Sequence, residues 1–197
     1  MKKRLPAAVA LGILEAAAIL LLSACLPRRS GLDRDIPVYL QPDMPPGFEA
    51  AIRDCMAIWN REFGTGLRFA GHSEGGTARD GRNTISLGVA APPFSGRRRG
   101  EGRLEADRLG FALNWRRGAR IEETDILINV SWRLATRSAL GPGDYCLETL
   151  ILHELGHLFG LPHDYREESL MYPRMEPGRV RLEIDDRMRA EFSRRYY

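Results

Sequence analysis

The pattern of hydrophobic and polar positions predicts a small sheet with helices before and after its central part. Short runs that are rich in β-branched and aromatic residues, or that alternate between apolar and polar positions, are typical of strands. They occupy residues 36–40, 66–71, 83–88, 108–115 and 124–130. Apolar residues at helical spacing occupy residues 46–64, about 146–159 and about 184–195. We therefore predict an α/β (α+β) fold: a small twisted mixed sheet with an early helix, a middle helix and a C-terminal helix.

The N-terminal residues have the pattern of an export signal. Lys2, Lys3 and Arg4 precede a largely apolar run that ends in "LSAC", the lipobox pattern of bacterial lipoproteins. We therefore expect residues 1–24 to be a cleaved signal peptide and Cys25 to carry lipid, although an uncleaved anchor helix is the alternative. Residues 25–35 would be a linker, and residues 36–197 a single domain in the bacterial cell envelope, outside the cytoplasm. Leu26 is compatible with the outer membrane, which we expect over the inner one.

The charge balance argues against nucleic acid as a partner. The net charge is +3, and removing residues 1–24 takes away three basic residues and one acidic residue, which leaves +1. A nearly neutral domain has no electrostatic basis for binding phosphate backbones. The expected contact with a membrane is therefore the lipid on Cys25, and the oligomeric state is not set by the sequence.

The two remaining cysteines are candidates for a disulfide. An oxidising compartment outside the cytoplasm would allow Cys55 and Cys146 to pair. A disulfide needs Cα atoms within about 7 Å, which a sequence cannot show. The pairing therefore stays open at this point.

The middle helix carries a histidine pattern with the spacing of a metal site. His153 and His157 are four residues apart and project from one face of a helix, where two imidazoles can bind one metal ion. Glu154 lies beside the first ligand, within reach of a water on the metal. Gly160 lets the chain reverse, so that His163 can return as the third ligand. A surface helix that happens to carry Glu and His is the alternative, but the five fixed positions of HExxHxxGxxH disfavour it.

This motif resembles that of the metzincin zinc peptidases, and the sequence that follows resembles the matrixins among them. "SLMYP" (169–173) is similar to the matrixin Met-turn, which places Met171 beneath the metal. The resemblance extends more weakly over most of residues 36–195. It implies an endopeptidase that binds one catalytic Zn²⁺, in which zinc activates a water and Glu154 acts as general base.

The resemblance also implies how a peptide or protein substrate binds. An extended peptide would lie antiparallel to the strand that holds Gly110, Phe111 and Ala112. Tyr172 and Pro173 would form the wall of the specificity pocket. Thr149, four residues before His153, lies where matrixins set the depth of this pocket. Its small side chain predicts an open pocket and an apolar residue after the cleaved bond.

Some features depart from the matrixin pattern. We expect no inhibitory prodomain between Cys25 and Ile36, and no second, structural zinc, because His72 is the only histidine outside the motif. Asp164 after the third histidine is more usual in the snake-venom-type metzincins. Calcium is common in the family, but no run of calcium ligands supports it here. Two other functions stay open: a non-catalytic lipoprotein of this fold that acts as a binding or assembly module, and a zinc amidase acting on cell-wall peptide.

Overall fold

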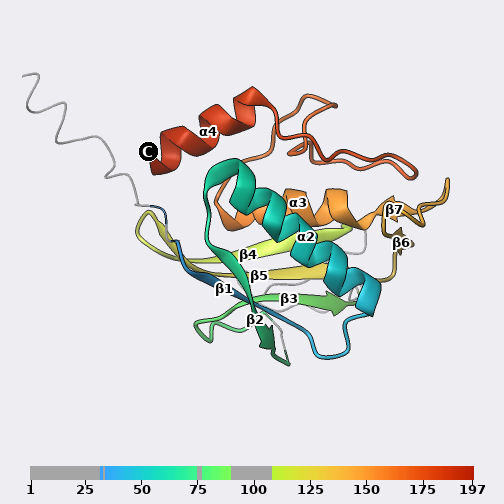
Figure 1. Cartoon of the computed structure of the whole chain (residues 1–197), viewed down its shortest axis with the longest axis horizontal. Helices are drawn as coiled ribbons and strands as arrows, with labels where there is room; N and C mark the ends of the chain where they lie inside the picture. The colour runs from blue at the N-terminus through green and yellow to red at the C-terminus, as the bar shows by residue number, and fades with distance from the viewer. Residues whose placement is uncertain (1–31, 33, 75–76, 90–107) are drawn as a thin grey trace, which may run out of the picture.

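The structure, a computed structural model, describes residues 32, 34–74, 77–89 and 108–197. Its main sheet has five strands: β1 (Ile36–Leu40), β2 (Leu67–His72), β3 (Asn83–Gly88), β4 (Gly110–Arg117) and β5 (Arg120–Asn129). The helices are α2 (Pro46–Phe63), α3 (Leu147–Leu158) and α4 (Asp186–Tyr196). The predicted fold class, a mixed sheet with an early, a middle and a C-terminal helix, is confirmed (Figure 1).

The order of the strands leaves β4 at one edge of the sheet. The order is β2-β1-β3-β5-β4, and all neighbours are parallel except β4 and β5, which are antiparallel. In the register of that last pair Gly110 lies opposite Ile128, and Ala112 lies opposite Ile126. The outer edge of β4 therefore has no neighbouring strand in the described part of the chain.

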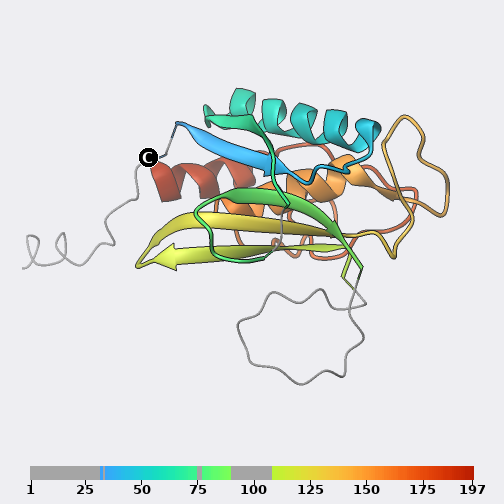
Figure 2. The same cartoon turned by 90° about the horizontal axis from the view of Figure 1, so that it is seen from below.

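The helices α2 and α3 pack together on one face of this sheet (Figures 1 and 2). An aromatic cluster joins α2 to the end of α3 and to α4: the Trp59 ring lies 4.7 Å from Phe63 and 5.0 Å from Phe159, and Phe63 lies 4.3 Å from Phe192. Trp59 also donates a hydrogen bond from Nε1 to the carbonyl of Leu152. Offset aromatic contacts of this kind stabilise a core beyond the area that they bury. The cluster therefore ties α3 and α4 to one rigid core.

The strands β4 and β5 form a longer hairpin than the sequence predicts. β5 begins at Arg120 instead of 124, and β4 extends to Arg117, with Gly118 at φ +60° in the turn. The segment 116–123 is mostly charged, so it has no apolar alternation, yet it pairs across the hairpin. Two short strands, β6 (Leu134–Ala135) and β7 (Tyr145–Cys146), were not predicted because two residues make no period.

All three helices begin and end close to the predicted positions. Asp185 caps α4, because its carboxylate accepts a hydrogen bond from the backbone N–H of Met188. Gly64 ends α2 with φ +62°, a left-handed conformation that glycine adopts without strain.

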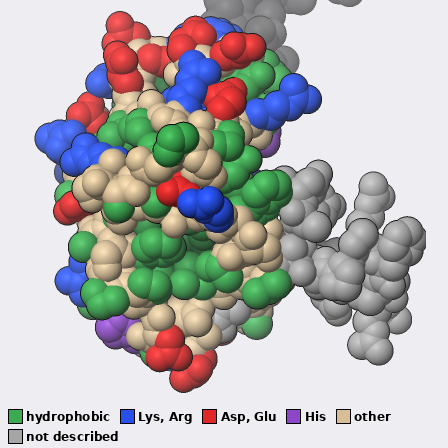
Figure 3. Space-filling view, turned by 90° about the vertical axis from the view of Figure 1, so that its right-hand side faces the viewer, with side chains coloured by type: hydrophobic (Ala, Val, Ile, Leu, Met, Phe, Trp, Pro, Cys, Tyr) green, Lys and Arg blue, Asp and Glu red, His purple; other side chains and the backbone are tan. Residues whose placement is uncertain are grey.

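The predicted signal peptide, the lipidation at Cys25 and most of the linker lie outside the described residues. Within the described residues, no helix is long and apolar enough to cross a membrane. Figure 3 looks at the end of the molecule where β3 and β5 finish, and much of that surface is formed by hydrophobic side chains. Val89 and Val130, which follow these two strands, are both exposed.

Candidate metal centre

The helix α3 holds the first two histidines against the core. Eleven of its twelve residues are buried, so its position is fixed on all sides except near His157. His153 is buried and His157 is partly exposed, and their rings lie 4.8 Å apart. The spacing of four residues therefore places both imidazoles on one face, as the sequence predicts.

The reversal at Gly160 brings the third histidine to the other two. Gly160 has φ +71°, and its N–H donates to the carbonyl of His157 at 2.8 Å. The Nε2 atoms of His157 and His163 are 3.1 Å apart, and the ligand atoms of all three histidines lie within 4.8 Å of one another. The three imidazoles thus converge on one point.

Two backbone carbonyls set the tautomers of the helical histidines. His153 Nδ1 lies 2.8 Å from the carbonyl of Leu170, and His157 Nδ1 lies 2.9 Å from the carbonyl of Leu161. A carbonyl only accepts, so each Nδ1 must carry the hydrogen, which leaves the lone pair of Nε2 free. Burial lowers the pKa of His153 to about 3 and also lowers the pKa of His157 and of His163. All three rings are therefore neutral at pH 7, the form that binds a metal.

This donor set fits zinc. Zinc bound by histidine has Zn–N distances of about 2.0–2.1 Å, so the nitrogens of a tetrahedral site lie about 3.4 Å apart. The 3.1 Å between His157 and His163 is close to this separation. Three histidines would also leave one coordination position open, which is typical of catalytic rather than structural zinc.

Glu154 is a buried carboxylate beside these histidines. It is 3% exposed, and its Oε2 atom has no hydrogen-bond partner among the described residues. Burial raises the pKa of Glu154 to about 8, although the positive charge of Arg108 acts in the opposite direction. A metal ion in the histidine site would act in the same direction as Arg108 and lower the pKa of Glu154. An orphaned carboxylate oxygen next to three neutral imidazoles indicates a missing cation or polar ligand, because buried polar groups are almost always paired.

Met171 lies against α3 at Gly156. It is buried, and its Sδ atom lies where a side chain on Gly156 would have to be: a Cβ there would be 2.4 Å from the sulfur. The Met-turn also supplies backbone contacts, since Asp164 N donates to the carbonyl of Met171 at 3.0 Å. The predicted Met-turn is therefore in contact with the helix between His153 and His157.

A cleft of about 960 Å³ runs past the histidines between β4 and the segment after Met171. Its walls include the predicted substrate-binding residues Gly110, Phe111, Ala112, Tyr172 and Pro173. A side chain at Gly110 would come within 3.3 Å of Glu154 Oε1 and 3.1 Å of the carbonyl of Leu127, so glycine leaves room for the carboxylate beside the strand.

Thr149 is not one of the residues that line this cleft. It is buried, and its hydroxyl accepts a hydrogen bond from the backbone N–H of Arg181 at 2.9 Å. Leu150, the next residue, lines the cleft instead. The tertiary structure therefore places Thr149 behind the pocket wall, where it holds the segment after the Met-turn.

Sequence reasoning missed several residues of the site. Asn114 on β4 donates from Nδ2 to the carbonyl of His157 at 2.8 Å and accepts from Thr124, which links the strand to the end of α3. Arg108 and Trp132 also line the cleft. No local pattern marks these residues, because their roles depend on contacts between segments that are far apart in sequence.

The two cysteines are free in the structure. Both are buried, and both lie near Glu148: Cys55 Sγ is 3.7 Å from its carbonyl, and Cys146 Sγ is 3.5 Å from its Oε2. Burial raises the pKa of each thiol. The disulfide that the sequence left open is therefore not formed here.

Comparison with known proteins identifies the family. The matrixin family profile matches residues 50–191, which is more than half of the chain. Metalloendoproteinase 2-MMP of Arabidopsis thaliana is 45% identical over 38 residues, 19% of this chain and 10% of that protein. Metalloendoproteinase 1-MMP of the same plant is 45% identical over 42 residues, 20% of this chain and 12% of that protein. The chain thus matches about a tenth of the length of these relatives. The family match and the three converging histidines agree, and the chain belongs to the matrixin family of zinc metallopeptidases.

Proposed function

We propose that this protein is a zinc-dependent endopeptidase. The observation that supports this best is the buried Glu154, with an unpartnered carboxylate oxygen, beside three neutral histidines whose ligand atoms lie within 4.8 Å of one another. Zinc, when bound by His153, His157 and His163, supplies a Lewis acid that activates a water and polarises the scissile carbonyl. The plant relatives are named metalloendoproteinases, which is consistent with this proposal.

Glu154 would act as the proton carrier. Its carboxylate takes a proton from the attacking water and then donates it to the leaving amine nitrogen. Burial favours the protonated form of Glu154, and the charge of Arg108 favours the ionised form. A carboxylate whose two forms are close in free energy near the operating pH suits both steps.

The edge strand β4 would hold the substrate. An extended peptide can add to an unpaired strand edge through main-chain hydrogen bonds, which are largely indifferent to side chains. β4 is the edge strand of the sheet, and Gly110, Phe111 and Ala112 line the cleft. The side chains of Leu150 and Tyr172 line the same cleft, which favours an apolar residue after the cleaved bond. A cleavage profile dominated by acidic residues or glycine at that position would contradict this specificity.

The decisive experiment compares hydrolysis of casein or a peptide library by the wild type, by Glu154→Gln and by wild type treated with a chelator. Loss of general base catalysis should lower the rate by about 10²–10⁴-fold in Glu154→Gln, with zinc still bound stoichiometrically. Glu167→Gln, an exposed glutamate on the loop before the Met-turn, is the matched control and should keep full activity. If the wild type binds zinc but hydrolyses no peptide, the protein acts as a binding or assembly module instead. Hydrolysis confined to cell-wall peptides would favour the amidase.

We also propose that the protein is held in the bacterial cell envelope through lipid on Cys25. The lipobox pattern at residues 22–25 supports this. Globomycin, which blocks cleavage of lipoprotein signals, should cause an uncleaved precursor to accumulate. Normal processing in its presence would contradict lipidation at Cys25.

A further inference from the structure

His163 is the ligand with the least support from its own surroundings. It lies on a loop and is exposed, whereas His153 and His157 are held by a buried helix and by backbone carbonyls. No described residue makes a hydrogen bond to its Nδ1 atom. A cavity of about 450 Å³ also separates this loop from α4, so packing from that side is incomplete. Something other than packing must therefore fix the position of His163.

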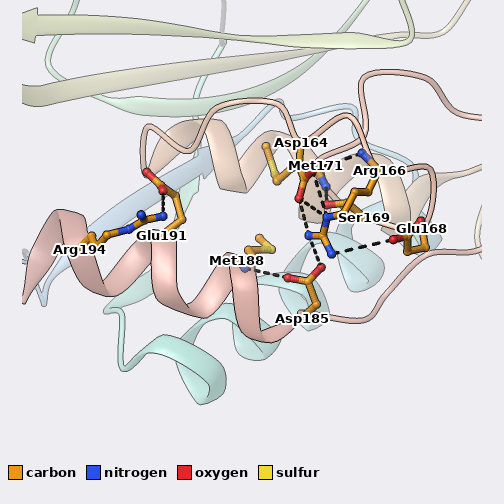
Figure 4. A network of polar contacts seen from close by, with 9 residues as sticks. All are labelled: Asp164, Arg166, Glu168, Ser169, Met171, Asp185, Met188, Glu191 and Arg194. Carbon is orange, nitrogen blue, oxygen red and sulfur yellow. Dashed lines mark hydrogen bonds and ion pairs between the residues drawn. The ribbon is translucent and has the colours of Figure 1, made fainter.

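A polar network crosses this cavity from the loop to α4 (Figure 4). The carboxylate of Asp164, the residue after His163, accepts from Arg166 Nε at 3.0 Å and also from Nη2. The same guanidinium donates from Nη2 to Asp185 Oδ2 at 2.8 Å. Arg166 thus joins Asp164, beside His163, to Asp185, the residue directly before α4, and its Nη1 also lies 3.9 Å from Oε1 of Glu168 on its own loop.

The far end of this network is rigid. Asp185 Oδ1 accepts from the N–H of Met188 at 2.7 Å, which caps α4. Met188 and Phe192 on that helix are buried, and Phe192 belongs to the aromatic cluster that includes Trp59. The network therefore connects the loop of His163 to the core that also holds α3 and the other two ligands.

The chemistry of the network suits a positioning role. The Arg166 side chain is only 34% exposed, and those of Asp164 and Asp185 are 20% and 29% exposed, so these pairs are less screened than surface pairs. A guanidinium presents its donors in a rigid planar fork, which fixes the direction of both carboxylates and not only their distance. On the same rim, Arg194 pairs with Glu191 of its own helix, so it links no second segment.

We propose that Arg166 is a positioning residue for the metal site: by bridging Asp164 and Asp185 it holds His163 where the third ligand must be, and so raises the affinity for zinc. This inference rests on the proposed zinc site. Without the bridge, the loop keeps the backbone hydrogen bond from Asp164 N to the carbonyl of Met171 but loses its link to α4, so the His163 side of the loop must be ordered when a metal ion binds. Loss of residues that orient metal ligands typically weakens metal binding by about 10–100-fold.

The test measures zinc affinity by competition with a fluorescent chelator, together with the absorption spectrum of the cobalt-substituted protein. Arg166→Ala should raise the dissociation constant by about 10-fold or more and weaken the d–d bands of tetrahedral cobalt, because the third imidazole is no longer held in place. Arg194→Ala is the matched control, and its dissociation constant should stay within about twofold of the wild type. The unfolding transition of each metal-free variant shows that the fold is retained.

Asp185→Asn separates the bridge from the helix cap. Asparagine caps a helix about as well as aspartate, but it lacks the charge that pairs with Arg166. Asp185→Asn should therefore also raise the dissociation constant for zinc, as Arg166→Ala does. The double variant should bind zinc about as weakly as Arg166→Ala alone, because both changes break the same interaction between Arg166 and Asp185. Additive losses, or an Arg166→Ala protein that is folded and binds zinc as tightly as the wild type, would overturn the inference. A wild type that binds no zinc would instead overturn the proposed function.

Discussion

Gly156 lies between His153 and His157 on α3, and it is the place where the Met-turn touches the helix. An added Cβ would lie 2.4 Å from Met171 Sδ and 3.0 Å from Met171 Cε, both well inside normal contact distance. The third neighbour, Trp59, would be at an ordinary 3.7 Å. Met171 is 2% exposed and lines the cavity of about 450 Å³ beside α4, so its side chain can move only against buried neighbours or into that cavity. The substitution Gly156→Ala therefore forces Met171 out of its position.

Two opposing free energies decide the outcome. Alanine stabilises a helix interior by about 1 kcal/mol relative to glycine. Overpacking of a core typically costs about 1–3 kcal/mol. We expect Gly156→Ala to lower the free energy of unfolding in the wild-type background, and to raise it by about 1 kcal/mol when Met171→Ala has already removed the sulfur. The effect of one substitution should thus change sign with the residue at 171.

A double-mutant cycle measures this directly. Urea unfolding of the metal-free wild type, Gly156→Ala, Met171→Ala and the double variant gives the four free energies, and the coupling should be about 1–3 kcal/mol in favour of the double variant. Gly47→Ala is a control on α2, where a Cβ would meet nothing within 4 Å. If Gly156→Ala has the same effect in both backgrounds, Met171 does not pack on Gly156 and the reasoning is wrong.

Three further predictions concern pH, zinc and thiols. Burial raises the pKa of Asp125 from 3.8 to about 6, so between these values the unfolded chain loses its proton before the folded one does; the contribution of Asp125 to stability should fall by about 2 kcal/mol from pH 4 to pH 7, measured by urea unfolding as the difference between the wild type and Asp125→Asn. A difference between the two proteins that does not change with pH would contradict the raised pKa of Asp125. Zinc at 100 times its dissociation constant should raise the free energy of unfolding by about 2.7 kcal/mol, measured as a higher Tm that a chelator abolishes; an unchanged Tm would mean that the metal does not bind the folded state preferentially. Thiol titration of the unfolded, unreduced protein should find Cys55 and Cys146 both reactive, because both are free in the structure, whereas two unreactive thiols would show that they pair.

Much of the fold follows from short-range pattern. Val38 and Leu40 are buried two positions apart on β1, and Ile52, Cys55 and Trp59 recur on the buried face of α2. These periods of two and of about 3.6 are properties of the local backbone, so a sequence shows them directly. The charged hairpin segment 116–123 has no such period, because both of its faces are largely exposed beyond the core, and it was missed for that reason.

The sequence by itself determined which residues form the proposed metal site: the spacing of His153 and His157 and the reversal at Gly160 are local geometry, and the resemblance to matrixins added Met171. Only the tertiary structure decided how these residues are supported. The position of β4 at the edge of the sheet, the contact of Asn114 with His157 and the bridge of Arg166 between Asp164 and Asp185 all join segments that are distant in sequence. The burial of Thr149 likewise depends on a distant segment, because its hydroxyl accepts a hydrogen bond from the backbone N–H of Arg181. A periodic pattern reports which face of an element is buried, but not which other element covers it, and that second fact fixes the surroundings of the site.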